Sequence, residues 1–145
     1  MTRTARVSEA LDFWIGEWDC KWDGGHGTNS VDRVMNGHVV RERFQSVEPE
    51  RWSGTSMSVH QAHSDRWLQT WVDSSGGYWH FEGGLVDGDM AFATPEPVDA
   101  HQLYKRMVFF NIEPDHFDWR WETSSDRDLW DLRWQIDYTR RGATG

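Results

Sequence analysis

The side chains best suited to acid–base chemistry lie on two segments of the chain. His80 and Glu82 alternate on one segment, and Glu42 lies on another. A histidine beside a carboxylate can act as a general acid/base pair, because histidine titrates near neutral pH and the carboxylate can fix its tautomer. His80, Glu82 and Glu42 are therefore the candidate catalytic residues. The alternative is that His80 and Glu82 lie on an outer surface and take no part in a site.

Two arginines are candidates for holding a ligand. Arg33 and Glu42 are expected to be diagonal neighbours on one hairpin face, close enough for their side chains to meet. If that face is buried, the pair must be hydrogen-bonded or serve a ligand; the alternative is a structural ion pair. Arg106 shares a strand face with Tyr104 and Val108. It could hold the carboxylate of an acidic ligand through two hydrogen bonds, or pair with a surface acid.

Motifs typical of metal, phosphate and nucleophile sites do not occur in the sequence. Its seven histidines are scattered, with no His-Glu-x-x-His, Gly-x-Ser-x-Gly, phosphate-loop or dinucleotide-binding glycine pattern. We therefore expect no metal and no cofactor. Cys20 is the single cysteine. It shares a face with Trp18 and Trp22, which favours a buried thiol over a reactive one.

Eleven tryptophans reveal the elements that must position these residues. Phe117, Trp119 and Trp121 alternate with polar residues, as do Trp134 and Ile136. A period of two places side chains on one face of a β-strand. A sheet with an aromatic face can shield that face from water by closing into a barrel. We predict one all-β domain over residues 1–145, an antiparallel up-and-down barrel of about ten strands with a short helix at about 8–14. Strands are expected near 17–23, 28–35, 38–45, 55–62, 67–73, 78–84, 90–94, 102–111, 117–122 and 130–138.

Two turns set the expected registers. Asn36-Gly37 suits a two-residue turn that places Val34 opposite Val39 and Val31 opposite Glu42. With Ser75-Gly76 at the tip of the next such turn, Trp71 would lie opposite His80 and Gln69 opposite Glu82. Both faces of the 67–73 and 78–84 strands are partly apolar, so the sequence leaves open which face points inward.

Composition limits the classes of partner. The formal net charge of -9 argues against nucleic acid and anionic membranes, which attract Lys and Arg. No segment approaches the ~20 apolar residues of a membrane-spanning helix, and no signal peptide is recognisable. We therefore expect a cytoplasmic protein, either a monomer or a homodimer.

Several motifs resemble known families. Gly16-Glu17-Trp18 resembles the Gly-x-Trp signature of lipocalins, in which the tryptophan packs against an arginine near the end of the last strand; Arg140 is the matching candidate and Arg141 the alternative. A longer likeness, to uncharacterised small bacterial proteins of a domain of unknown function with a lipocalin-like (calycin-type) barrel, implies that fold and no established activity. It rests on Phe13–Trp18, Asn36-Gly37 with Arg41-Glu42, Trp67-x-Gln69-x-Trp71-Val72-Asp73, Trp121-Glu122-x-Ser124-x-Asp126 and Tyr138-x-Arg140.

The favoured function is the binding of a small hydrophobic or aromatic ligand, acidic if Arg106 points inward, in an aromatic-lined cavity. One alternative is a small enzyme, such as a cyclase, isomerase or hydrolase of a secondary metabolite, that uses acid/base residues in the same cavity. Another is an interaction module whose cavity is filled by its own tryptophans. The predicted ligand-binding residues are Arg33, Glu42, Phe44, Gln69, Trp71, His80, Arg106, Trp119, Trp121 and Trp134.

Overall fold

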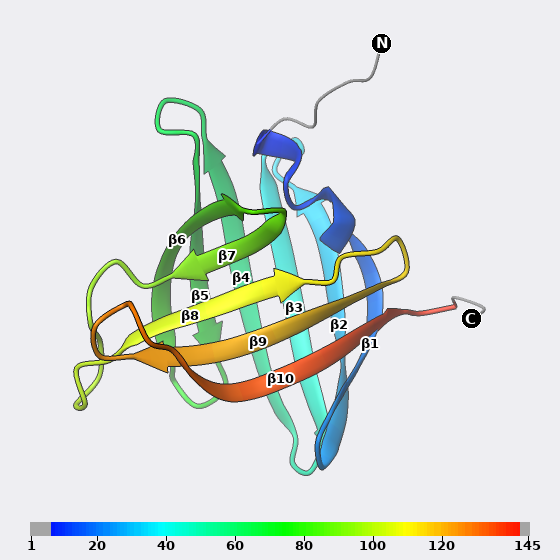
Figure 1. Cartoon of the computed structure of the whole chain (residues 1–145). Helices are drawn as coiled ribbons and strands as arrows, with labels where there is room; N and C mark the ends of the chain where they lie inside the picture. The colour runs from blue at the N-terminus through cyan, green and yellow to red at the C-terminus, as the bar shows by residue number, and fades with distance from the viewer. Residues whose placement is uncertain (1–6, 143–145) are drawn as a thin grey trace.

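Ten antiparallel strands close into a single barrel in the computed structural model, which describes residues 7–142 (Figure 1). Each strand pairs with the next along the chain, and the last pairs with the first. The predicted all-β up-and-down barrel is confirmed. Its strands are β1 (Gly16–Trp22), β2 (Gly25–Val34), β3 (Val39–Glu48), β4 (Trp52–Gln61), β5 (Arg66–Asp73), β6 (Tyr78–Val86), β7 (Asp89–Ala93), β8 (Tyr104–Phe110), β9 (His116–Ser124) and β10 (Asp131–Arg140).

The segment before β1 forms two 3₁₀ turns instead of the predicted short helix. These are η1 (Val7–Glu9) and η2 (Asp12–Trp14), and the Trp14 amide donates to the Leu11 carbonyl three residues back, at 3.0 Å. Leu11 and Trp14 are buried in the aromatic core. A segment this short gains little from α-helix formation, so packing of these side chains decides its shape.

Arg140 closes the end of the barrel at which the N-terminal turns η1 and η2 lie. Its guanidinium lies 4.3 Å from the ring centroid of Trp18 and donates to the carbonyls of Ile15 (2.8 Å) and Phe13 (3.2 Å). The Trp18 indole in turn donates to the Trp14 carbonyl at 2.8 Å. The expected contact between Trp18 and Arg140 is therefore confirmed, and it fixes the N-terminal turns across this end.

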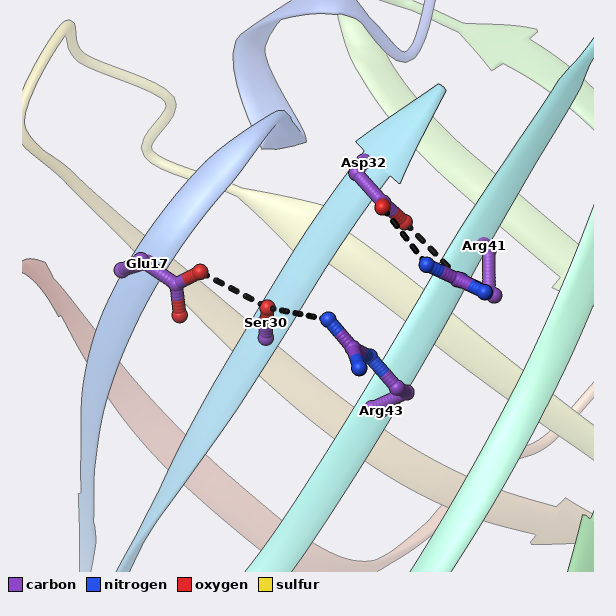
Figure 2. Close-up of polar contacts among 5 residues, drawn as sticks. All are labelled: Glu17, Ser30, Asp32, Arg41 and Arg43. Carbon is purple, nitrogen blue, oxygen red and sulfur yellow. Dashed lines mark hydrogen bonds and ion pairs between the residues drawn. The ribbon is translucent and has the colours of Figure 1, made fainter. Parts of the chain in front are cut away.

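Polar side chains cover the outer face of β1, β2 and β3 (Figure 2). Arg41 donates two hydrogen bonds to Asp32, at 2.7 and 3.1 Å. The Ser30 hydroxyl donates to Glu17 at 2.8 Å and accepts from Arg43 at 3.4 Å. Solvent screening makes surface pairs of this kind contribute little to stability, so their main consequence is a hydrated outer wall opposite an apolar interior.

One of the two expected registers is confirmed and the other is wrong by one residue. Val34 lies opposite Val39, and Val31 opposite Glu42, as the Asn36-Gly37 turn predicts. In the β5–β6 hairpin, Trp71 lies opposite Trp79 instead of His80. A slip of one residue moves every side chain of a strand to the other face.

The wrong register has a local cause at the 74–77 turn. The Asp73 carboxylate accepts hydrogen bonds from the amides of Ser75 and Gly77, both at 2.9 Å. The Gly76 amide donates to the Asp73 carbonyl at 3.0 Å, and Gly76 has a φ of 82°. These bonds produce a longer turn than the expected two-residue loop. Within residues 7–142, no helix is long and apolar enough to cross a membrane.

Candidate ligand-binding site

A cavity of about 250 Å³ lies inside the barrel. Trp52, Asp73, Trp79 and Lys105 mark its mouth, because they lie beside the loops at the end of the barrel opposite the N-terminal turns. The side chains lining the cavity come from β3, β4, β5, β6, β8, β9 and β10, so almost the whole barrel wall contributes. They are Glu42, Phe44, Trp52, Trp71, Asp73, Trp79, Phe81, Lys105, Met107, Trp119, Trp121, Trp134, Ile136 and Tyr138.

Aromatic rings in mutual contact form a belt around this cavity. Trp119 and Trp121 stack with ring centroids 6.2 Å apart and an interplanar angle of 9°, and Trp134 meets Trp119 edge-on at 5.6 Å. On the opposite wall of the barrel, the ring centroids of Trp52 on β4 and Trp71 on β5 are 5.8 Å apart. Such contacts hold each ring in place in the wall of the cavity. The aromatic belt consists of Phe44, Trp52, Trp71, Trp79, Trp119, Trp121 and Trp134.

Glu42 is the polar centre of the cavity floor. It is only 8% exposed, and its two carboxylate oxygens accept hydrogen bonds from Asn29 Nδ2 and Ser56 Oγ, both at 2.7 Å. Burial raises the pKa of Glu42 to about 7, although the two hydrogen bonds oppose the shift. Near neutral pH this carboxyl group is therefore poised between its protonated and ionised forms.

Tyr138 and Cys20 lie beside Glu42. Asn29 Nδ2 also donates to the Tyr138 hydroxyl at 3.0 Å, which joins β2, β3 and β10 through one side chain. Burial raises the pKa of both Tyr138 and Cys20. Both groups are therefore neutral at physiological pH, and the sequence-based expectation that Cys20 is a buried thiol is confirmed.

Lys105 and Asp73 bring charge to the mouth. The Lys105 ammonium lies 2.8 Å from Asp99 and 5.7 Å from the ring centroid of Trp79. The Asp73 carboxylate accepts a hydrogen bond from the Trp71 indole at 2.9 Å. Although burial opposes it, this bond and those from the turn amides lower the pKa of Asp73, so the group is ionised.

Six of the ten predicted ligand-binding residues line the cavity together: Glu42, Phe44, Trp71, Trp119, Trp121 and Trp134. Gln69 is fully buried, and its amide donates to Ser58 at 2.9 Å, but it lies outside the cavity lining. The aromatic wall and its carboxylate are thus among the residues that the sequence singles out.

Three candidate residues lie outside the cavity, as the alternative for each of them expects. His80 and Glu82 lie on the outer face of β6, where Glu82 faces Arg66 at 3.5 Å, because the hairpin register differs by one residue. Arg106 also lies outside: it donates to Glu122 at 2.9 Å and stacks 4.0 Å from the Trp130 ring centroid. Its neighbours Lys105 and Met107 line the cavity instead. Both faces of β8 carry apolar side chains, so alternation alone does not select the inward face.

Arg33 does not reach Glu42. It pairs with Asp12 of η2 and donates to the Gly37 carbonyl at 3.2 Å, which ties the N-terminal turns to the β2–β3 hairpin. Glu42 finds Asn29 and Ser56 in its place. The expected Arg33–Glu42 pair is therefore wrong, and both predicted arginine contacts to a ligand lack a place in this cavity.

Several site residues were missed at the sequence level. Asn29 and Ser56 are small polar residues on inward faces, and only the register of β3 against β2 and β4 brings them to Glu42. Lys105 lies between Tyr104 and Arg106 on a strand without clear alternation. For Asn29 a signal was present, because it falls two residues before Val31 on a face predicted to share the side of Glu42.

One group of potential metal ligands lies on the outer wall. His116 Nε2 is 3.0 Å from Asp137 Oδ2 and 3.6 Å from Asp118 Oδ1. Burial lowers the pKa of His116, but the bond and charge of Asp137 outweigh it and raise the pKa overall. The three side chains therefore satisfy one another as an ion-paired cluster, remote from the cavity lining.

Comparison of the sequence with protein-family models and with curated proteins found no match.

Proposed function

We propose that the protein binds a small apolar or aromatic molecule inside the barrel. The observation that carries this proposal is the cavity of about 250 Å³ that remains open within the aromatic belt. It lies close to the ~300 Å³ lower range of ligand pockets, which suits a molecule the size of one aromatic ring with a short side chain. The belt supplies contact area, and Glu42 and Tyr138 supply the few polar groups that orient a ligand.

We further propose that the barrel is lipocalin-like. The Gly16-Glu17-Trp18 segment opens β1, and the stacking of Arg140 on Trp18 closes the end opposite the cavity mouth. Both features support the resemblance described above. A barrel of this size with one closed end and one open end suits a protein that holds a single small ligand.

The test is a tryptophan-fluorescence screen with single-ring probes, including phenols, phenylalkyl alcohols, amines and acids. Ile136 lines the cavity, whereas Leu132 on the same strand is 57% exposed. Ile136→Phe should fill the cavity and abolish saturable quenching, and Leu132→Phe should leave it unchanged. Saturable binding that survives Ile136→Phe in full would contradict the proposed location.

A second candidate function, acid–base catalysis, rests on Glu42. It is the one predicted catalytic residue among those lining the cavity, and its pKa of about 7 suits proton transfer near neutral pH. Incubating a small-molecule extract with the wild type and with Glu42→Gln, followed by mass spectrometry, tests it. An enzyme would consume a compound that the variant binds but does not convert.

A further inference from the structure

We propose that the preferred ligand is an organic cation carrying an aromatic ring, with its ammonium group beside Glu42 and its ring within the aromatic belt. This inference rests on the proposed function and specifies the class of ligand. It comes from the charges of the cavity, the unused acceptor positions of Glu42 and the ring faces around them.

The charges that line the cavity favour a cation. Glu42 and Asp73 are its carboxylates and Lys105 is its cation, and no arginine or histidine is among the lining residues of the described chain. Asp99 already pairs with Lys105 at 2.8 Å. The lining is therefore acidic on balance. An anionic ligand would meet Glu42 and Asp73 without a free guanidinium to hold it, since Arg106 lies on the outer wall beside Glu122.

Glu42 retains capacity to accept hydrogen bonds from a ligand. An ionised carboxylate offers about four acceptor positions, and Asn29 and Ser56 occupy one on each oxygen. Because Glu42 lines the cavity, its remaining acceptor positions can serve a ligand there. An ammonium group carries donors only, so it matches these acceptors and also compensates the buried negative charge.

The aromatic belt supplies the second half of the recognition. Faces of tryptophan rings attract cations, and aromatic cages of this kind recognise ammonium ligands. The protein already places one cation in this way, because the Lys105 ammonium lies over Trp79 at the mouth. A ligand cation deeper in the cavity would lie between such ring faces and a carboxylate, while its own ring stacks within the belt.

Binding of a cation should be coupled to ionisation of Glu42. The titratable groups packed against Glu42 are Cys20 from β1 and Tyr138 from β10, and burial keeps both neutral. β2 and β4 contribute the neutral side chains of Asn29 and Ser56. With a pKa of about 7, Glu42 is mostly protonated at pH 6 and mostly ionised at pH 8. Affinity for a cation should therefore rise about tenfold over this interval.

The experiment compares three probes that share one phenylethyl frame: 2-phenylethylamine, 2-phenylethanol and phenylacetate. Their dissociation constants are measured by calorimetry at pH 6, 7 and 8 for the wild type, Glu42→Gln and Glu48→Gln. Glu48 is exposed on the same strand and serves as the matched control. At pH 8 the amine should bind the wild type at least about tenfold more tightly than the alcohol, and this advantage should shrink as the pH falls to 6.

In Glu42→Gln the advantage of the amine over the alcohol and its pH dependence should both disappear, while Glu48→Gln behaves as the wild type. Equal binding of amine and alcohol, or tightest binding of phenylacetate, would overturn the cation preference and leave cavity binding intact. Binding of none of the three would overturn the inference, while the wider screen with Ile136→Phe judges the proposed function separately. If Glu42→Gln does not fold, the pH series on the wild type still decides between these outcomes.

Discussion

Replacing Glu42 with glutamine should change how the stability of the barrel depends on pH. The folded protein holds the pKa of Glu42 at about 7, above the ordinary value of 4.5 that applies to the unfolded chain. Between these two values the folded state binds more protons than the unfolded state, so the free energy of unfolding falls as the pH rises. The stabilising contribution is full below about pH 4.5 and is lost as the pH rises through 7.

The magnitude follows from the size of this shift. One pKa unit corresponds to about 1.4 kcal/mol, so raising the pH from 5 to 8 should cost the wild type about 2–3 kcal/mol through Glu42 alone. Glu42→Gln cannot ionise and should lack this cost, whereas the exposed Glu48→Gln should keep it. The variant should therefore gain stability relative to the wild type as the pH rises.

Urea unfolding followed by tryptophan fluorescence at pH 5, 6, 7 and 8 measures this difference. Comparing each variant with the wild type at each pH cancels the titrating groups that the two proteins share. A constant difference between Glu42→Gln and the wild type across this range would show that Glu42 ionises freely in the folded protein. That result would refute the assignment of Glu42 as a buried, desolvated carboxyl group in the cavity.

Three other substitutions test the architecture around the cavity. Gly54→Ala should place a Cβ atom within the ring of Trp71 and push the indole toward the cavity. We therefore expect weaker binding of phenylethyl probes in calorimetry and a loss of stability of about 1–3 kcal/mol. Unchanged probe affinity would contradict this expectation. Arg140→Met removes the contact with Trp18 and the bonds to nearby carbonyls, so urea unfolding should show a loss of about 2–4 kcal/mol while probe affinity is retained. His80→Ala should leave both properties within error, since His80 is exposed on the outer wall, and any loss of probe binding would return it to the site.

Sequence predicted the barrel well because its inward residues repeat with a period of two. β10 illustrates this, since Trp134, Ile136 and Tyr138 point inward between exposed polar residues. The Asn36-Gly37 turn also fixed its hairpin register, because both residues have positive φ values, 62° and 81°, as that turn type requires. Where local chemistry has one favourable solution, the sequence is sufficient.

The polar residues of the site were harder to predict, because their positions depend on choices that the sequence leaves open. The 74–77 turn can close in more than one way, and the hydrogen bonds of the Asp73 side chain select the longer form. β8 is apolar on both faces, so the inward position of Lys105 and the outward position of Arg106 follow only from barrel closure. The partners of Glu42 depend in the same way on three strands meeting in register.

A crystal structure grown with a phenylethyl probe that binds in solution tests the central claim most directly. We expect density for the probe inside the barrel, in contact with the aromatic belt and within hydrogen-bond reach of Glu42. Density confined to the outer wall, for example in the surface depression beside Arg106 and Trp130, would contradict the account.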